Sequence, residues 1–147
     1  MSPVGRFRFS LETVLKVRGL REEQARAEVA RAQLELERSR QALKETQELR
    51  VRMLEDLQGG KKEWTPQDFS IFKAYLDHLK LAVEGWEQRI VEQEEDVQAK
   101  TEILKQRYQE RRLLEQLRKK HYDIYRRELM KDMEKETETI VLGRWNL

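Results

Sequence analysis

Helix-breaking residues gather in one place in this chain, residues 58–66. The stretch reads Gln-Gly-Gly-Lys-Lys-Glu-Trp-Thr-Pro and holds two of the six glycines and one of the two prolines. Gly59 is placed to end a helix in the left-handed conformation that glycine enters at low cost. Thr65 is placed as the N-cap of a second helix, with Pro66 at its first position and Asp68 in its first turn. The sequence therefore predicts two helices joined by a single turn.

Both predicted helices carry an apolar seam with alternating spacings of three and four residues, the pattern of a coiled coil. We expect helix 1 at residues 10–57 with Ser10 as its cap, a turn at 58–65, helix 2 at 66–138, and flexible ends at 1–9 and 139–147. The seam of helix 1 comprises Ala25, Val29, Ala32, Leu36, Ser39, Leu43, Thr46, Met53 and Leu57. The strongest part of the second seam comprises Phe69, Phe72, Leu76, Leu79, Val83, Trp86 and Ile90.

Composition supports the same fold class. Charged residues make up 39% of the chain and hydrophobic residues 38%, which leaves too little apolar material for a compact globule. The net charge is only +2 and helix-forming residues dominate, so disorder is also disfavoured. We predict an all-α protein, a single elongated domain in which the two helices form an antiparallel coiled-coil hairpin. An enclosed active site is not expected, so we predict no enzyme activity.

The second helix is longer than the first and should overhang it. Pairing from the turn places residues opposite each other when their numbers sum to about 123, so helix 2 lacks a partner beyond Arg112. This predicted overhang is either covered by another molecule or is a frayed, solvated terminus. Within the hairpin, bulky seam residues lie near the turn and alanines lie toward the open end, which predicts a looser open end. The apolar residues of the overhang are Leu113, Leu114, Leu117, Ile124, Leu129, Met130 and Met133.

Charge is unevenly distributed along helix 2. Residues 84–96 hold six acids and one base, a net charge of −5, and residues 100–120 hold eight bases and three acids, a net charge of +5. The basic stretch could attract an acidic protein partner, contact a nucleic-acid backbone, or form a solvated helix laced with ion pairs. Nucleic acid is the weaker functional option because stacking platforms are missing and the net charge is small.

Motifs for catalysis, cofactors and metals are missing from the pattern. His78 and His121 lie far apart among charged neighbours, and the sequence has no cysteine. Gly59-Gly60-Lys61-Lys62 lacks the spacing of a phosphate-binding loop. No apolar run approaches the roughly 20 residues of a spanning helix, and the first residues do not resemble a secretory signal. We expect a cytoplasmic protein without a cofactor, metal or small-molecule ligand.

The stretch Phe7-Arg8-Phe9-Ser10-Leu11-Glu12-Thr13-Val14-Leu15-Lys16-Val17-Arg18 resembles the opening of the FliJ family of flagellar type III export proteins. Length, the single glycine-rich turn and the basic second helix also agree. The resemblance implies a non-enzymatic stalk, similar to the rotor subunits of rotary ATPases, that is monomeric alone and peripheral to the membrane export apparatus. The implied partners are the hexameric export ATPase, the membrane export gate and export chaperones, and nucleic acid is not among them.

The resemblance also implies two groups of site residues. For the ATPase they are Phe7, Phe9, Leu11, Leu15, Arg18, Arg111, Arg112, Leu117, Arg118, Lys119 and Lys120. For the export gate they are Phe69, Phe72, Tyr75, Leu76 and Leu79, where the apolar arc is wider than a two-stranded coil buries. Two other hypotheses remain open, namely a self-associating coiled-coil scaffold and a chaperone-handling adaptor of a related secretion system.

Overall fold

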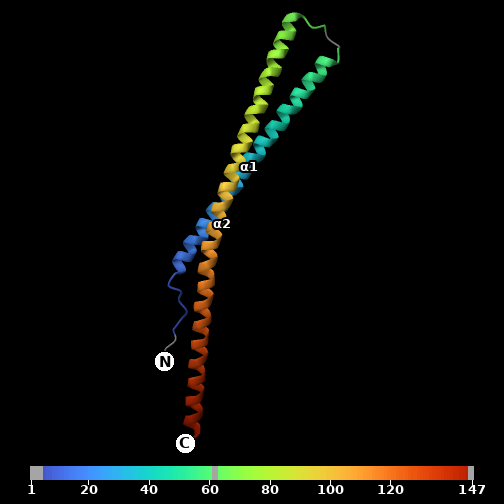
Figure 1. Ribbon diagram of the computed structural model, residues 1–147. Helices are drawn as coiled ribbons and strands as arrows, with labels where there is room; N and C mark the ends of the chain where they lie inside the picture. The colour runs from blue at the N-terminus through green and yellow to red at the C-terminus, as the bar shows by residue number, and fades with distance from the viewer. Residues whose placement is uncertain (1–4, 61–62, 146–147) are drawn as a thin grey trace. The chain divides into compact units, whose positions relative to one another are not determined.

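The computed structural model describes residues 5–60 and 63–145, which form two α-helices (Figure 1). Helix α1 spans Glu12–Gln58 and helix α2 spans Pro66–Trp145. These described residues contain no strand, so the predicted all-α fold with two long helices is confirmed. Parts of the predicted flexible ends (1–4 and 146–147) and of the predicted turn (61–62) lie outside the described residues.

The start of α2 follows the predicted capping pattern. The backbone N–H of Asp68 donates to the Thr65 hydroxyl at 3.1 Å, and the backbone N–H of Thr65 donates to the Asp68 carboxylate at 3.3 Å. This reciprocal arrangement satisfies N–H groups that the first turn of a helix leaves unpaired, and Pro66 has no N–H to satisfy. The predicted N-cap at Thr65 is therefore confirmed.

The left-handed glycine of the turn is Gly60, where Gly59 was expected. Gly60 has a φ of 62°, whereas the N–H of Gly59 donates to the carbonyl of Glu55 at 2.9 Å, as in a continuing helix. The helix end is therefore one residue later than predicted, at Gln58. A side chain at residue 60 would be strained by this φ, so a glycine is favoured there.

The outer ends of both helices also differ from the prediction. Helix α1 begins at Glu12. The N–H of Glu12 donates to the carbonyl of Phe9 at 3.1 Å, which forms a turn directly before the helix. Helix α2 continues through residues 139–145, beyond the expected end at Glu138. A lone glycine such as Gly143 costs a helix only about 1 kcal/mol, and no proline follows to stop it.

The chain packs as two compact units, each of which takes part of both helices. The turn unit is Ala25–Ile103, and the terminal unit is Met1–Gln24 together with Leu104–Leu147. The expectation of a single elongated domain stays a prediction. Among the described residues, neither helix has a stretch long and apolar enough to cross a membrane.

In the turn unit, α1 and α2 run antiparallel and the predicted seam lies between them (Figure 1). Its buried members are Ala25, Val29, Ala32, Leu36 and Ser39 on α1 and Leu79 and Ile90 on α2. Burial does not follow side-chain size along this seam, because residues next to the turn are only half-buried and Phe69 is 51% exposed, so the looser open end stays a prediction. Alanines let two helices approach closely enough to exclude water, whereas the bulky side chains near the turn leave part of their own surface exposed.

In the terminal unit, the register differs from the one expected from the turn. Arg18 pairs with Glu110 and Glu22 pairs with Arg111, although the turn-centred register would have placed them near residues 105 and 101. The chain before α1 also lies on α2, because Phe7 contacts Tyr125. The unpartnered part of α2 therefore does not begin at Arg112 as predicted. Counting outward from the turn therefore gives the wrong partners.

Candidate protein-binding surfaces

The seam of the terminal unit is charged. Arg18 donates to the Glu110 carboxylate at 2.6 Å, and Arg118 donates to the Glu12 carboxylate at 2.8 Å. Both pairs join α1 to α2, and their side chains are about a third or more exposed. Exposed pairs of this kind contribute little to stability, about 0–1 kcal/mol each. Their main effect is to fix which residues of the two helices face each other.

Glu22 and Arg111 form the most buried of these pairs. Only 7% of the Glu22 side chain and 23% of the Arg111 side chain remain accessible, and Arg111 donates to both carboxylate oxygens. Hydrogen bonds to Glu22 and then to Glu115 raise the pKa of the Arg111 guanidinium above its ordinary value. A buried carboxylate needs such a partner, because an uncompensated charge is costly away from water. Arg111 is therefore part of the packing of this unit.

The segment before α1 is held on α2 by aromatic contacts. The ring of Phe7 lies 5.2 Å from that of Tyr122 and 5.5 Å from that of Tyr125, and Phe9 meets His121 edge to face at 5.3 Å. Phe9 is only 6% exposed. Residues 5–9 were predicted to be part of a flexible end, but their aromatic side chains pack against the helix. Because they precede the helical repeat, its periodicity gave no signal for where they dock.

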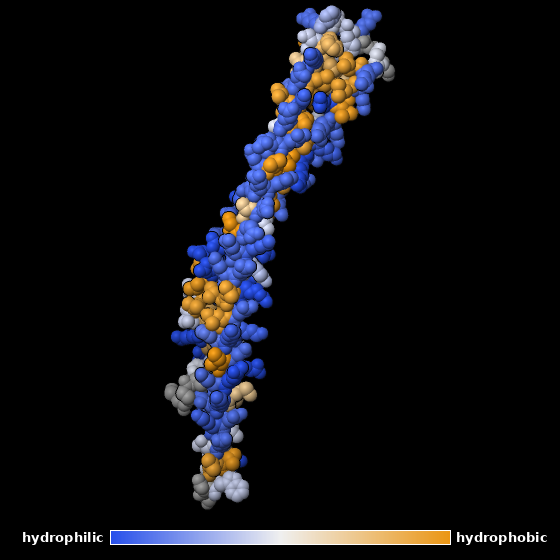
Figure 2. Space-filling model, viewed as in Figure 1, coloured by the Kyte–Doolittle hydropathy of each residue, from blue (hydrophilic) through white to orange (hydrophobic). Residues whose placement is uncertain are grey.

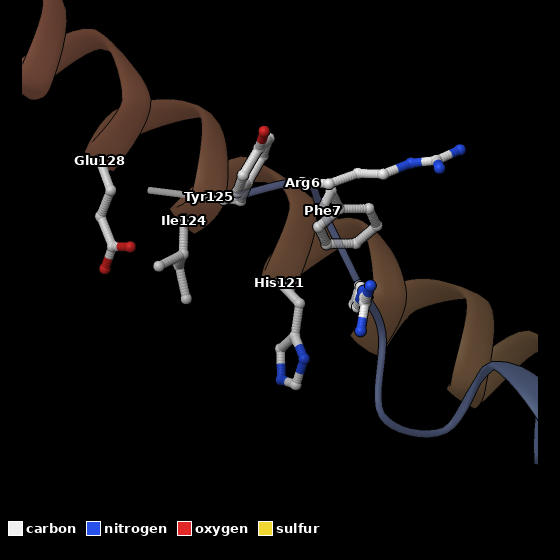
Figure 3. Close-up of a pocket in the computed structure, with 8 residues that line it drawn as sticks. Arg6, Phe7, His121, Ile124, Tyr125 and Glu128 are labelled. Carbon is white, nitrogen blue, oxygen red and sulfur yellow. The ribbon is translucent and has the colours of Figure 1, made fainter. Parts of the chain in front are cut away.

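A shallow cleft of about 520 Å³ lies where this segment crosses α2. The segment contributes residues 5–8 to its lining, and α2 contributes His121, Ile124, Tyr125 and Glu128. Figure 3 shows His121, Ile124 and Glu128 projecting from one side of α2, while Arg6 extends outward. Arg6 and Arg8 give the cleft a cationic edge. Ile124, which is 51% exposed, gives it an apolar floor.

The residues that the resemblance assigns to ATPase binding fall into three groups in the structure. Phe7 and Phe9 pack on α2, and Leu11, Leu15 and Leu117 are half-buried. Arg18, Arg111 and Arg118 form ion pairs within the chain. Arg112, Lys119 and Lys120 are exposed and form no ion pair with any residue that the structure describes. These last three are the side chains that a partner could reach directly.

The residues assigned to gate binding differ in accessibility. Leu79 is buried in the seam, Phe72 and Leu76 are half-buried, and Phe69 and Tyr75 are 51% and 43% exposed. A second groove, of about 270 Å³, is lined by Met53, Trp64, Asp68, Ile71, Phe72 and Tyr75.

Figure 2 shows apolar side chains gathered over the parts of both helices next to the turn. Sequence reasoning missed Met53 and Trp64 at this groove, because neither belongs to the apolar arc of α2. The Trp64 ring meets Phe72 at 4.9 Å and thereby joins the turn to this face of α2.

Comparison with known proteins identifies the family. The family model described as flagellar FliJ protein matches residues 7–139. The chain belongs to the FliJ family. The family match confirms the resemblance and identifies the chain as a component of the flagellar protein export apparatus. No curated protein and no solved structure matches the chain. The match ends just before residues 140–145, the last helical residues of α2.

Proposed function

We propose that this FliJ-family chain is a non-enzymatic stalk of the export apparatus that binds the hexameric export ATPase through its terminal unit. In this role it promotes assembly or activity of the ATPase ring and associates with the membrane export apparatus at its periphery. The observation that carries the proposal is the excess of positive charge in this unit. Its described residues, 5–24 and 104–145, hold seventeen bases against eleven acids.

The ion pairs within the unit leave much of this charge available. Four acids, at positions 12, 22, 110 and 115, pair with arginines of the same unit. Arg112, Lys119 and Lys120 remain exposed on α2. Cations on the rim of an interface accelerate association with an acidic partner, and their contribution falls as salt increases. This surface is therefore suited to electrostatic capture of a protein partner.

The test is binding of the purified chain to its cognate export ATPase, measured with ATP hydrolysis. Reversing the charge at Arg112, Lys119 and Lys120 should weaken binding by about tenfold or more at low salt, and by less at high salt. Lys73→Glu with Lys80→Glu, two exposed sites on α2 of the turn unit, is the control. If the wild-type chain neither binds the ATPase nor changes its hydrolysis or hexamer formation, the proposal is wrong.

The turn unit is proposed to contact the membrane export gate through the exposed apolar face of α2. Phe69, Ile71 and Tyr75 supply that face, and apolar patches rimmed by polar residues are typical of protein interfaces. Phe69→Ser with Tyr75→Ser should reduce capture of the detergent-solubilised gate protein. Leu81→Ser, at a site that is 66% exposed on the same helix, serves as the control. Equal capture of both variants would contradict a role for this face.

A self-associating scaffold is the second candidate, and one observation favours it. The last turns of α2 expose several apolar side chains, with Met130 at 55%, Met133 at 59% and Ile140 at 61%. Pairing of two copies would cover them, since coiled coils commonly close in this way. Light scattering at micromolar concentration distinguishes the candidates, because a monomer excludes the scaffold and a tight dimer supports it. A chaperone-handling adaptor would instead capture purified export chaperones in the same assay.

A further inference from the structure

The cleft at residues 5–8 and α2 carries positive charge that the chain does not neutralise. Arg6 and Arg8 are exposed and form no hydrogen bond or ion pair with the residues that the structure describes. Lys120 and Arg127 lie one helical turn before and after Ile124 on α2, so they flank the same cleft. Glu128 is the one acid of the lining. The deeper arginines of this unit, by contrast, are paired with acids.

The cleft has an apolar floor, and the Phe7 ring beside it is engaged in contacts within the chain. Ile124 is 51% exposed, which leaves room for an aliphatic side chain against it. The Phe7 ring contacts Tyr122 and Tyr125, and the guanidinium of Arg118 lies 5.4 Å from its centre. These contacts leave the Phe7 ring half-buried, so less of it is available for a base to stack on. This disfavours nucleic acid as the occupant.

We infer that this cleft binds a short acidic segment of a partner protein, in which an Asp or Glu lies beside an aliphatic residue. The carboxylate is held by Arg6 and Arg8, which reach it from the segment before α1, and the aliphatic side chain rests on Ile124. Arginine suits this task because its planar group can donate two parallel hydrogen bonds to a carboxylate. The inference rests on the proposed function in one respect, since it takes the export ATPase as the source of the acidic segment.

The experiment compares the full chain with the double variant Arg6→Glu/Arg8→Glu. The matched control is Lys16→Glu/Arg21→Glu, which changes the net charge equally at exposed sites of α1 in the same unit. Each protein is titrated with the cognate export ATPase and with a fluorescein-labelled peptide of Glu and Leu residues. A peptide with Gln in place of Glu, a DNA duplex and anionic vesicles complete the set. Circular dichroism verifies that the three proteins are equally helical.

The expected result is a loss of about tenfold in affinity for the ATPase and for the Glu peptide in the Arg6/Arg8 variant, with little change in the control. Equal ATPase binding by all three proteins would overturn the inference and leave the proposed function standing. If no protein binds the ATPase, the proposed function fails, and the peptide decides the inference alone. Equal affinity for the Glu and Gln peptides, or tighter binding of duplex or vesicles than of the Glu peptide, would overturn it.

Discussion

The turn unit and the terminal unit each pack a stretch of α1 against a stretch of α2, but with different seams. In the turn unit the buried positions hold Ala25, Val29, Ala32 and Leu36. In the terminal unit the same three-four spacing leads to Glu22, which is buried and paired with Arg111. Apolar seams gain free energy from every square ångström removed from water, whereas ion pairs must first offset the loss of hydration.

This difference predicts that the two units are unequal in stability. The terminal unit relies on partly exposed ion pairs and on the aromatic contacts of residues 5–9. Such regions open more readily than apolar seams, and surfaces that rearrange on binding are commonly found in them. The charged seam therefore suits the unit that we propose to bind the ATPase. The apolar seam should keep the turn unit folded.

The largest effect should come from the apolar seam. Leu36 is 6% exposed, and Leu36→Ala should lower the free energy of unfolding by about 2–3 kcal/mol because it leaves a cavity between the helices. Leu34, two residues earlier, is 51% exposed, so Leu34→Ala should cost less than about 0.5 kcal/mol. Urea unfolding followed by circular dichroism measures both. Similar costs for the two variants would show that the seam does not dominate the stability of the turn unit.

A second, smaller effect tests the charged seam. Arg111→Leu removes the guanidinium from the buried Glu22 carboxylate and should destabilise the chain by about 2 kcal/mol. The double variant Glu22→Leu/Arg111→Leu replaces the pair with apolar side chains and should recover most of that loss. Urea unfolding of the wild type, both single variants and the double variant gives the coupling energy. Additive losses would mean that the two residues act independently.

Much of the turn unit could be predicted from sequence because its signals are local. The three-four spacing from Phe72 to Ile90 marks the side of α2 that faces α1, and Thr65 and Pro66 mark its start. Phe69 fits the same spacing but is exposed, because the helices offer no cover for it next to the turn. Periodicity shows which residues lie on one face of a helix, and burial depends on what lies opposite.

The terminal unit was less predictable for the same reason. Arg18, Arg111 and Arg118 were assigned to a partner, yet each pairs with an acid of this chain. The ion-pair partner of a charged residue on one helix cannot be predicted until the register of the two helices is known. The register differs from the one counted from the turn in both units, since Arg40 of the turn unit pairs with Glu94. In the terminal unit, Phe7 and Phe9 also dock outside any helical repeat.

The smallest effect concerns acid. Partial burial raises the pKa of the Glu110 carboxyl, but the hydrogen bond from Arg107 and the charge of Arg18 outweigh it and hold the pKa below its ordinary value. A lowered pKa means that the folded chain holds the proton less tightly than the unfolded chain. Glu110 therefore contributes stability above its unfolded pKa, and loses it as the pH falls through the folded value. Urea midpoints between about pH 7 and pH 3 should fall less in Glu110→Gln than in the wild type. Glu28→Gln, on the exposed side of α1 in the turn unit, should retain the wild-type slope. A slope in Glu110→Gln parallel to that of the wild type would show that Glu110 does not contribute to the acid sensitivity of the chain.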